Sequence, residues 1–146
     1  MRLTNYTDYA LRVLIYLAAK GEDKKATITE ITDAYSISRN HLTKVIHQLG
    51  KLEVIQTIRG RGGGILLNKK PHEITVGAIV RETEEDFHLV ECFRSETNIC
   101  VLNPYCGLKG ILQEALNAYL AVLDRYTIED IVEKPSVYRM LLNLQD

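Results

Sequence analysis

Three cysteines lie close together in a chain that has no others. Cys92, Cys100 and Cys106 fall within fifteen residues of a 146-residue sequence, with the spacing Cys-x7-Cys-x5-Cys. An odd number of clustered cysteines argues against a disulfide framework. Inert thiols, a zinc site and an iron–sulfur cluster remain as interpretations. Zinc sites more often contain Cys-x2-Cys pairs, whereas loose spacing around a loop suits a larger cluster whose irons lie apart.

A site with three thiolates needs a fourth ligand. His88 lies four residues before Cys92 and is a local candidate. An acidic side chain from elsewhere in the protein is the other candidate.

A second set of residues has the pattern of a DNA-reading helix, expected from Ser38 to about Leu52. One stripe at helical spacing is apolar, and the opposite stripe can donate hydrogen bonds to base edges and phosphates. This predicted helix contains no acidic residue before Glu53. A solvated helix face, usually more balanced in charge, is the alternative. The candidate contacts on this helix are Ser38, Arg39, Asn40, His41, Lys44, His47, Gln48 and Lys51.

A glycine-rich loop follows this helix and carries two further candidates, Arg59 and Arg61. The residues before the loop, 54–59, and those after it, 65–67, are predicted as two strands of a hairpin. Four glycines in five residues exclude a regular element between them. An arginine on such a tip suits a minor groove or a phosphate. A nucleotide-binding loop would instead lead into a helix.

Helices that hold these candidates are expected at 4–20, 27–35 and 38–52, with capping residues Thr27 and Ser38. Together with the hairpin they predict a winged helix-turn-helix domain over residues 1–70. The fold class is therefore mainly α with a small β wing.

Residues 71–146 are predicted to hold the cysteines and the contacts between subunits. A helix at 76–85 precedes an irregular segment, 86–106, which carries all three cysteines. A long helix at 105–126, ~33 Å in length, has an apolar face too broad for one neighbour in so small a chain. It is therefore predicted to mediate dimerisation, with folding back onto its own domain as the alternative. Short helices are expected at 128–133 and 136–143.

Charge divides unevenly between these two regions. Residues 1–70 carry a net charge of +6 and residues 71–146 carry −7, which together give −1. A basic N-terminal module indicates a polyanionic partner such as double-stranded DNA. No membrane-spanning segment and no signal peptide are recognised, so a cytoplasmic location is expected. No nucleophile–base pair stands out, so an enzyme is not expected.

The chain resembles the Rrf2 family of bacterial winged-helix regulators. The resemblance rests on Leu3–Arg12 (LTNYTDYALR), Ser38–Val45 (SRNHLTKV), Gly60–Gly64 (GRGGG) and the three cysteines before a long helix. Within the family it is most similar to the nitric-oxide-sensing repressors. The seven-residue gap between the first two cysteines is longer than the five that are commoner in the family.

The resemblance implies a homodimer with one cluster on each subunit, [4Fe–4S] favoured over [2Fe–2S], held by Cys92, Cys100 and Cys106. It implies that Asp8 of the partner subunit is the fourth ligand. His88 falls outside the family pattern and is therefore less favoured as a ligand. Another branch uses a histidine three residues after the last cysteine, where this chain has Lys109. Asp8 could instead pair with Arg12, one helical turn away.

The implied function is a repressor of a palindromic operator that releases nitrosative-stress genes when nitric oxide reaches the cluster. The alternatives are a cluster-free regulator of the same family that responds to another signal and a zinc-stabilised interaction module.

Overall fold

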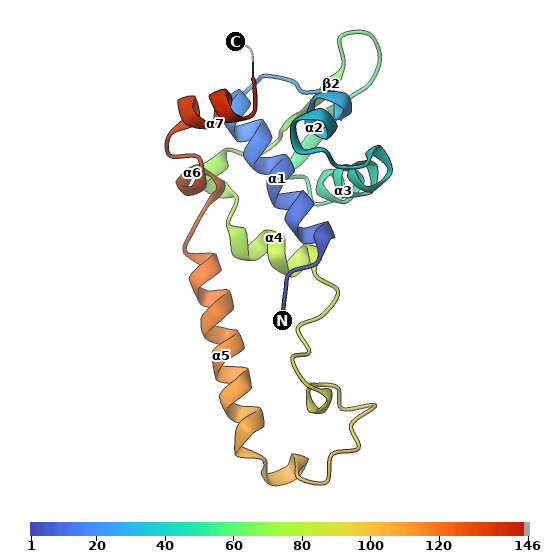
Figure 1. Ribbon diagram of the computed structural model, residues 1–146, viewed down its shortest axis with the longest axis vertical. Helices are drawn as coiled ribbons and strands as arrows, with labels where there is room; N and C mark the ends of the chain where they lie inside the picture. Colours follow the sequence, from blue (N-terminus) through green and yellow to red (C-terminus); the bar gives the residue numbers. More distant parts are fainter. Residues whose placement is uncertain (145–146) are drawn as a thin grey trace.

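The structure, a computed structural model, describes residues 1–144 (Figure 1). Its N-terminal part contains α1 (Asn5–Lys20), α2 (Ile28–Tyr35) and α3 (Arg39–Lys51). Each begins at a side chain that accepts a backbone N–H three residues later: Thr4, Thr27 and Ser38. Ser36 ends α2 in the left-handed conformation, which makes the turn into α3. The predicted helix-turn-helix is confirmed.

The wing is the antiparallel pair β1 (Ile55–Ile58) and β2 (Gly64–Leu67), with Ile55 opposite Leu67. The loop between them depends on glycine, because Gly60 and Gly62 have φ values of 90° and 73°. Lys25 donates a hydrogen bond to the carbonyl of Gly62. Ala26 and Ile65 exchange two backbone hydrogen bonds of 2.8 and 2.7 Å. The segment before α2 therefore supports the base of the wing.

The C-terminal part begins with a 3-10 turn, η1 (Pro71–Glu73), and α4 (Val76–Thr83). Two further 3-10 turns, η2 (Glu91–Phe93) and η3 (Asn103–Tyr105), interrupt the irregular segment before α5 (Gly107–Asp124). The chain then forms α6 (Ile128–Ile131) and α7 (Pro135–Leu141). The long helix thus starts two residues later than predicted, because residues 103–105 form the separate turn η3. Its 18 residues span ~27 Å rather than ~33 Å.

The hydrophobic core is built around α1, which contacts α3, α4, α6 and α7. Leu14 and Leu17 of α1 share this core with Leu42 and Leu49 of α3. Ile128 of α6 is fully buried in the same core. Helices from the end of the chain therefore pack against the first helix and help to fix the winged domain.

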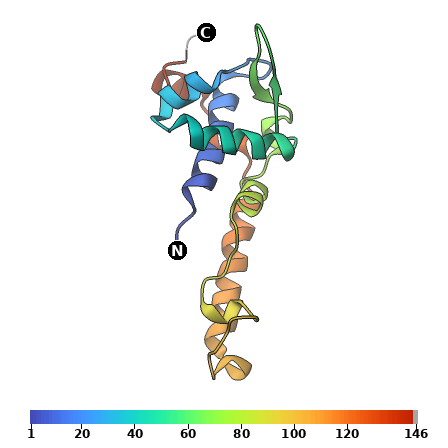
Figure 2. The ribbon, with the colours of Figure 1, turned by 90° about the vertical axis from the view of Figure 1, so that its right-hand side faces the viewer.

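Helix α5 extends away from this body as a stalk (Figures 1 and 2). Leu116 faces inward and is buried, but Leu108 and Ile111 are 59% and 64% exposed and Val122 is 42% exposed. Such apolar exposure along one helix marks a surface that lacks a partner within a single chain. Among residues 1–144, no helix has the length and apolarity needed to cross a membrane.

The stalk is anchored where α4 meets the end of α5. Arg81 of α4 forms two hydrogen bonds with the Asp124 carboxylate, and Nη2 to Oδ2 measures 2.8 Å. Beside this pair, Gly77 is buried. A Cβ atom at Gly77 would overlap the Asp124 side chain and would lie 2.9 Å from the Asp124 backbone nitrogen. Only glycine allows α4 and α5 to approach this closely.

Gly77→Ala is therefore expected to destabilise the fold by about 1–3 kcal/mol, the usual cost of overpacking. The measurement is the urea midpoint of unfolding. Gly110→Ala is the matched control, because a Cβ there meets nothing within 4 Å. It should stabilise α5 by up to about 1 kcal/mol through helix propensity. An unchanged midpoint for Gly77→Ala would contradict the close approach.

Candidate metal centre and nucleic-acid interface

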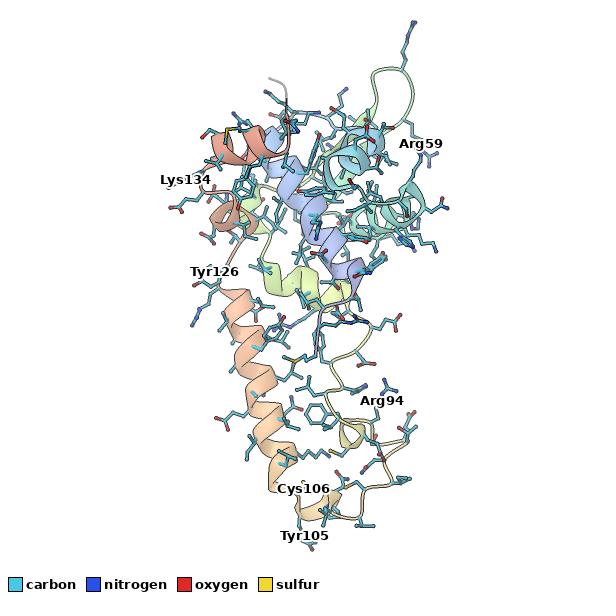
Figure 3. All side chains as sticks on the ribbon, viewed as in Figure 1. Arg59, Arg94, Tyr105, Cys106, Tyr126 and Lys134 are labelled. Atoms are coloured by element: carbon cyan, nitrogen blue, oxygen red, sulfur yellow. The ribbon has the colours of Figure 1, made fainter. Side chains whose placement is uncertain are left out.

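The structure places all three cysteines on the segment that joins α4 to the stalk. Cys92 lies in η2 and is half-buried, Cys100 is exposed, and Cys106 is the residue before α5. Each is a free thiol. Figure 3 shows Cys106 at the far end of the stalk, away from the body of the domain. None of the three contributes to the hydrophobic core, so the interpretation as buried inert thiols is not supported.

The three thiols do not form a site for a single metal ion. Within residues 1–144, no three side chains of His, Cys, Asp or Glu are grouped closely enough to hold one ion. A cluster makes a different demand, because its ligands bind separate irons and can stand further apart. Three soft thiols on one segment outside the core provide the donor type that such a cluster takes. The donor set therefore fits an iron–sulfur cluster and lacks one donor.

His88, the local candidate for a fourth ligand, and Lys109, which stands where another branch has a ligating histidine, both have other partners. Arg94 donates from Nε to Nδ1 of His88 at 3.0 Å and from Nη2 to Asp86 at 2.8 Å. The backbone N–H of His88, and then Arg94, hold the pKa of Asp86 below its usual value. Lys109 donates to the side chain of Asn103 at 2.9 Å. Both residues therefore form hydrogen bonds that help to hold the conformation of the cysteine segment.

Asp8 lies on α1, within the body of the domain. Its carboxylate is 2.9 Å from the guanidinium of Arg12, which confirms the predicted pair. Arg12 in turn lies over the ring of Tyr35, 5.7 Å from its centroid. The hydroxyl of Tyr35 donates to the Arg12 carbonyl at 3.0 Å. Burial raises the pKa of Tyr35 to about 12, so this donor keeps its proton.

Tyr35 was missed in the sequence, where only the spacing of Asp8 and Arg12 was informative. It is the last residue of α2, and Ser38 caps α3 three residues later. The contacts from Asp8 through Arg12 to Tyr35 therefore reach the turn that sets the position of α3.

Helix α3 has the two stripes that the sequence predicts. Its apolar stripe, Leu42, Val45, Ile46 and Leu49, is buried in the core. The opposite stripe, Asn40, Lys44, His47 and Lys51, is exposed along its whole length. No acidic side chain occurs in the helix. The helix is therefore anchored on one side and offers hydrogen-bond donors and positive charge on the other.

The flanking candidates differ in how freely they could meet a ligand. Ser38 accepts the backbone N–H of His41, and Arg39 donates to the Thr29 hydroxyl at 3.1 Å. His41 is exposed and stacks near Tyr9, with ring centroids 6.3 Å apart. Gln48 is half-buried. On the wing, Arg59 and Arg61 are both exposed, and Arg59 points away from the body of the domain (Figure 3).

Two tyrosines of α1 also reach α3 and were not predicted to do so. The Tyr6 hydroxyl donates to the Lys44 carbonyl at 3.2 Å, and Tyr9 lies beside His41. The helix that carries Asp8 thus contacts α3 at the backbone of Lys44 and the side chain of His41.

Comparison with known proteins places the sequence among transcriptional regulators. The model of the Rrf2 family, described as an iron-dependent transcriptional regulator, matches residues 3–134. An "HTH-type transcriptional regulator NsrR" of Bacillus licheniformis is 57% identical over 98% of this chain and 100% of its own length. The NsrR regulator of Bacillus subtilis is 54% identical over the whole of both chains. The solved structure of CymR, the global cysteine regulator of B. subtilis, has a TM-score of 0.74 and 27% identity, covering 91% of this chain and 97% of CymR.

Proposed function

This chain belongs to the Rrf2 family of iron-dependent transcriptional regulators, and from this membership we propose that it is a DNA-binding repressor whose iron–sulfur cluster senses nitric oxide. It is a transcriptional regulator of winged-helix fold and not an enzyme. The observation that carries the proposal is the group of three free thiols on one segment outside the core. Its location is proposed to be cytoplasmic.

Cys92, Cys100 and Cys106 are proposed to hold one cluster on each subunit, with four irons favoured over two. When bound, such a cluster supplies an iron that nitric oxide can ligate. Cys100 is exposed and Cys92 and Cys106 are only partly buried, which supports this assignment because both the metal and a small gas must reach the thiols.

Asp8 of the partner subunit is proposed as the fourth ligand, in a homodimer formed through the exposed face of α5. Within one chain, Asp8 belongs to the body, whereas the cysteine segment lies at the end of the stalk (Figure 1). Apolar residues beside the cysteines are strongly exposed, including Ile99 at 86% and Val101 at 89%. A second subunit over this segment would cover them and could bring its own carboxylate.

Asp8 would then have two competing partners, the metal of the other subunit and Arg12 of its own helix. The Asp8–Arg12 pair is about half-exposed, so it is worth only ~0.3–0.5 kcal/mol. The carboxylate can therefore leave Arg12 at little cost and return to it. Each exchange changes the charge beside Tyr35, at the turn into α3. In a dimer that reads a palindromic operator, small movements of α3 alter the fit to two half-sites one helical turn apart.

Asp8→Ala is accordingly expected to keep most of its iron, because the three thiolates remain, but to lose the response. Nitric oxide should change its operator Kd by less than twofold, whereas the parent should change by at least tenfold. Fluorescence anisotropy with labelled operator measures both. Asp33→Ala removes an equivalent charge from an exposed site on α2 and should respond like the parent. A full response from Asp8→Ala would rule out Asp8 as the switching ligand.

Anaerobic purification with metal and sulfide counting tests the cofactor itself. We expect four irons and four sulfides per subunit, with a brown colour. Two of each would indicate the smaller cluster. Zinc without sulfide would indicate a zinc-stabilised module, and the absence of both metals would indicate a cluster-free regulator; both of these results would overturn the proposal.

A further inference from the structure

The loop between the first two cysteines is closed by one side chain. Glu91 precedes Cys92, and Ile99 precedes Cys100. Oε1 of Glu91 accepts the backbone N–H of Ile99 at 2.7 Å. A single hydrogen bond thus joins the immediate neighbours of two cysteines that are eight positions apart in the chain.

Bonds on either side hold the ends of this loop. The side chain of Asn98 accepts the N–H of Cys100 at 3.0 Å, and the carbonyl of Cys100 accepts the N–H of Asn103 at 3.2 Å. Both the N–H and the carbonyl of Cys100 are therefore held by hydrogen bonds. Arg94 binds Asp86 and His88, which ties the chain after Cys92 to the chain before it.

We propose that Glu91 is a positioning residue that holds Cys92 and Cys100 as a preorganised pair of thiols. Of the seven residues between them, only Phe93 belongs to a regular element, the end of η2, so no helix or strand spans the loop to set their separation. Closing such a loop costs conformational entropy. When the loop is already closed, binding of a ligand to both thiols does not have to offset that entropy. The role in cluster binding rests on the proposed function, whereas the closure is a property of the cluster-free chain.

The test uses the full-length, cluster-free protein with Cys106→Ser, so that only Cys92 and Cys100 remain. The protein is equilibrated with oxidised and reduced glutathione, and mass spectrometry gives the oxidised fraction. One sulfur–sulfur bond forms between the two cysteines while glutathione disulfide is reduced to two molecules of glutathione. The ratio of oxidised to reduced protein, at known concentrations of both forms of glutathione, gives the effective molarity of one thiol toward the other.

Glu91→Ala should lower this effective molarity about fivefold, the contribution of one net hydrogen bond. It should speed amide hydrogen exchange at Ile99 by a similar factor. Glu91→Gln should stay within twofold of the parent, because its amide oxygen can accept the same N–H. Glu96→Ala, an exposed acid in the same loop, is the control and should also stay within twofold.

An unchanged effective molarity in Glu91→Ala, or an equal loss in Glu96→Ala, would overturn the proposal. So would a Gln variant as impaired as the Ala variant, because that would assign the effect to charge rather than to the closing bond. Failure of the cluster assignment would show separately, as a parent protein that purifies anaerobically without iron.

Discussion

Each of the single substitutions Cys92→Ser, Cys100→Ser and Cys106→Ser is expected to lower the iron content of anaerobically purified protein by at least tenfold and to abolish the response to nitric oxide. A hydroxyl is a poor replacement for a soft thiolate toward iron. Two thiolates and one distant carboxylate would remain, which is too few to retain a cluster. The measurements are iron and sulfide per subunit, followed by operator Kd with and without nitric oxide.

The fold should survive these substitutions, which separates loss of metal from loss of structure. None of the cysteines belongs to the hydrophobic core, so the free energy of unfolding of the cluster-free chain should change by less than about 0.5 kcal/mol. Thr97→Ala, in the exposed loop between Cys92 and Cys100, is a control for disturbance of the segment and should keep its iron. A cysteine variant with the iron and sulfide of the parent would contradict the ligand assignment.

The double substitution Arg59→Ala and Arg61→Ala is expected to weaken operator binding by about 100-fold at ~0.1 M salt. Each arginine that meets a phosphate or a minor groove contributes ~1–3 kcal/mol. If both meet phosphates, the slope of log K against log salt concentration should fall by about 2. Anisotropy titrations at several salt concentrations measure the affinity and the slope together.

A control for charge alone is available on the other side of the domain. Arg125 and Lys134 are exposed, and Figure 3 shows Lys134 on the side opposite to Arg59. Their double replacement by alanine removes the same net charge and should change the affinity by less than threefold. Equal losses from the two double variants would mean that the wing makes no specific contact.

Local patterns predicted the elements of the N-terminal half well because these elements are set by neighbours in the sequence. Thr27 and Ser38 cap helices within three residues of themselves, and the two stripes of α3 follow from helical spacing. The run of glycines at 60–64 predicted a loop, and Gly60 and Gly62 do adopt positive φ values there. The Asp8–Arg12 pair is likewise a contact across one helical turn.

Contacts between distant residues could not be predicted in the same way. Periodicity did not indicate that Arg12 would lie over the ring of Tyr35, because that contact depends on how α2 packs against α1. It also did not indicate that Glu91 would close the cysteine loop, because that bond depends on how an irregular segment folds back. The packing of α6 and α7 on α1 was also missed. The three thiols, the carboxylate of Asp8 and the exposed face of α5 were recognised individually, but the site proposed from them includes a second subunit. The division of function between residues 1–70 and 71–146 stays a prediction.

The most direct measurement of the central claim is the operator affinity of the iron-loaded protein during an anaerobic titration with nitric oxide. The DNA is a labelled duplex selected by that protein from a randomised palindromic library, and absorbance of the cluster is followed in the same cuvette. We predict that Kd rises at least tenfold as the cluster absorbance is lost. A Kd that stays constant while the absorbance disappears would contradict control of DNA binding through Cys92, Cys100 and Cys106.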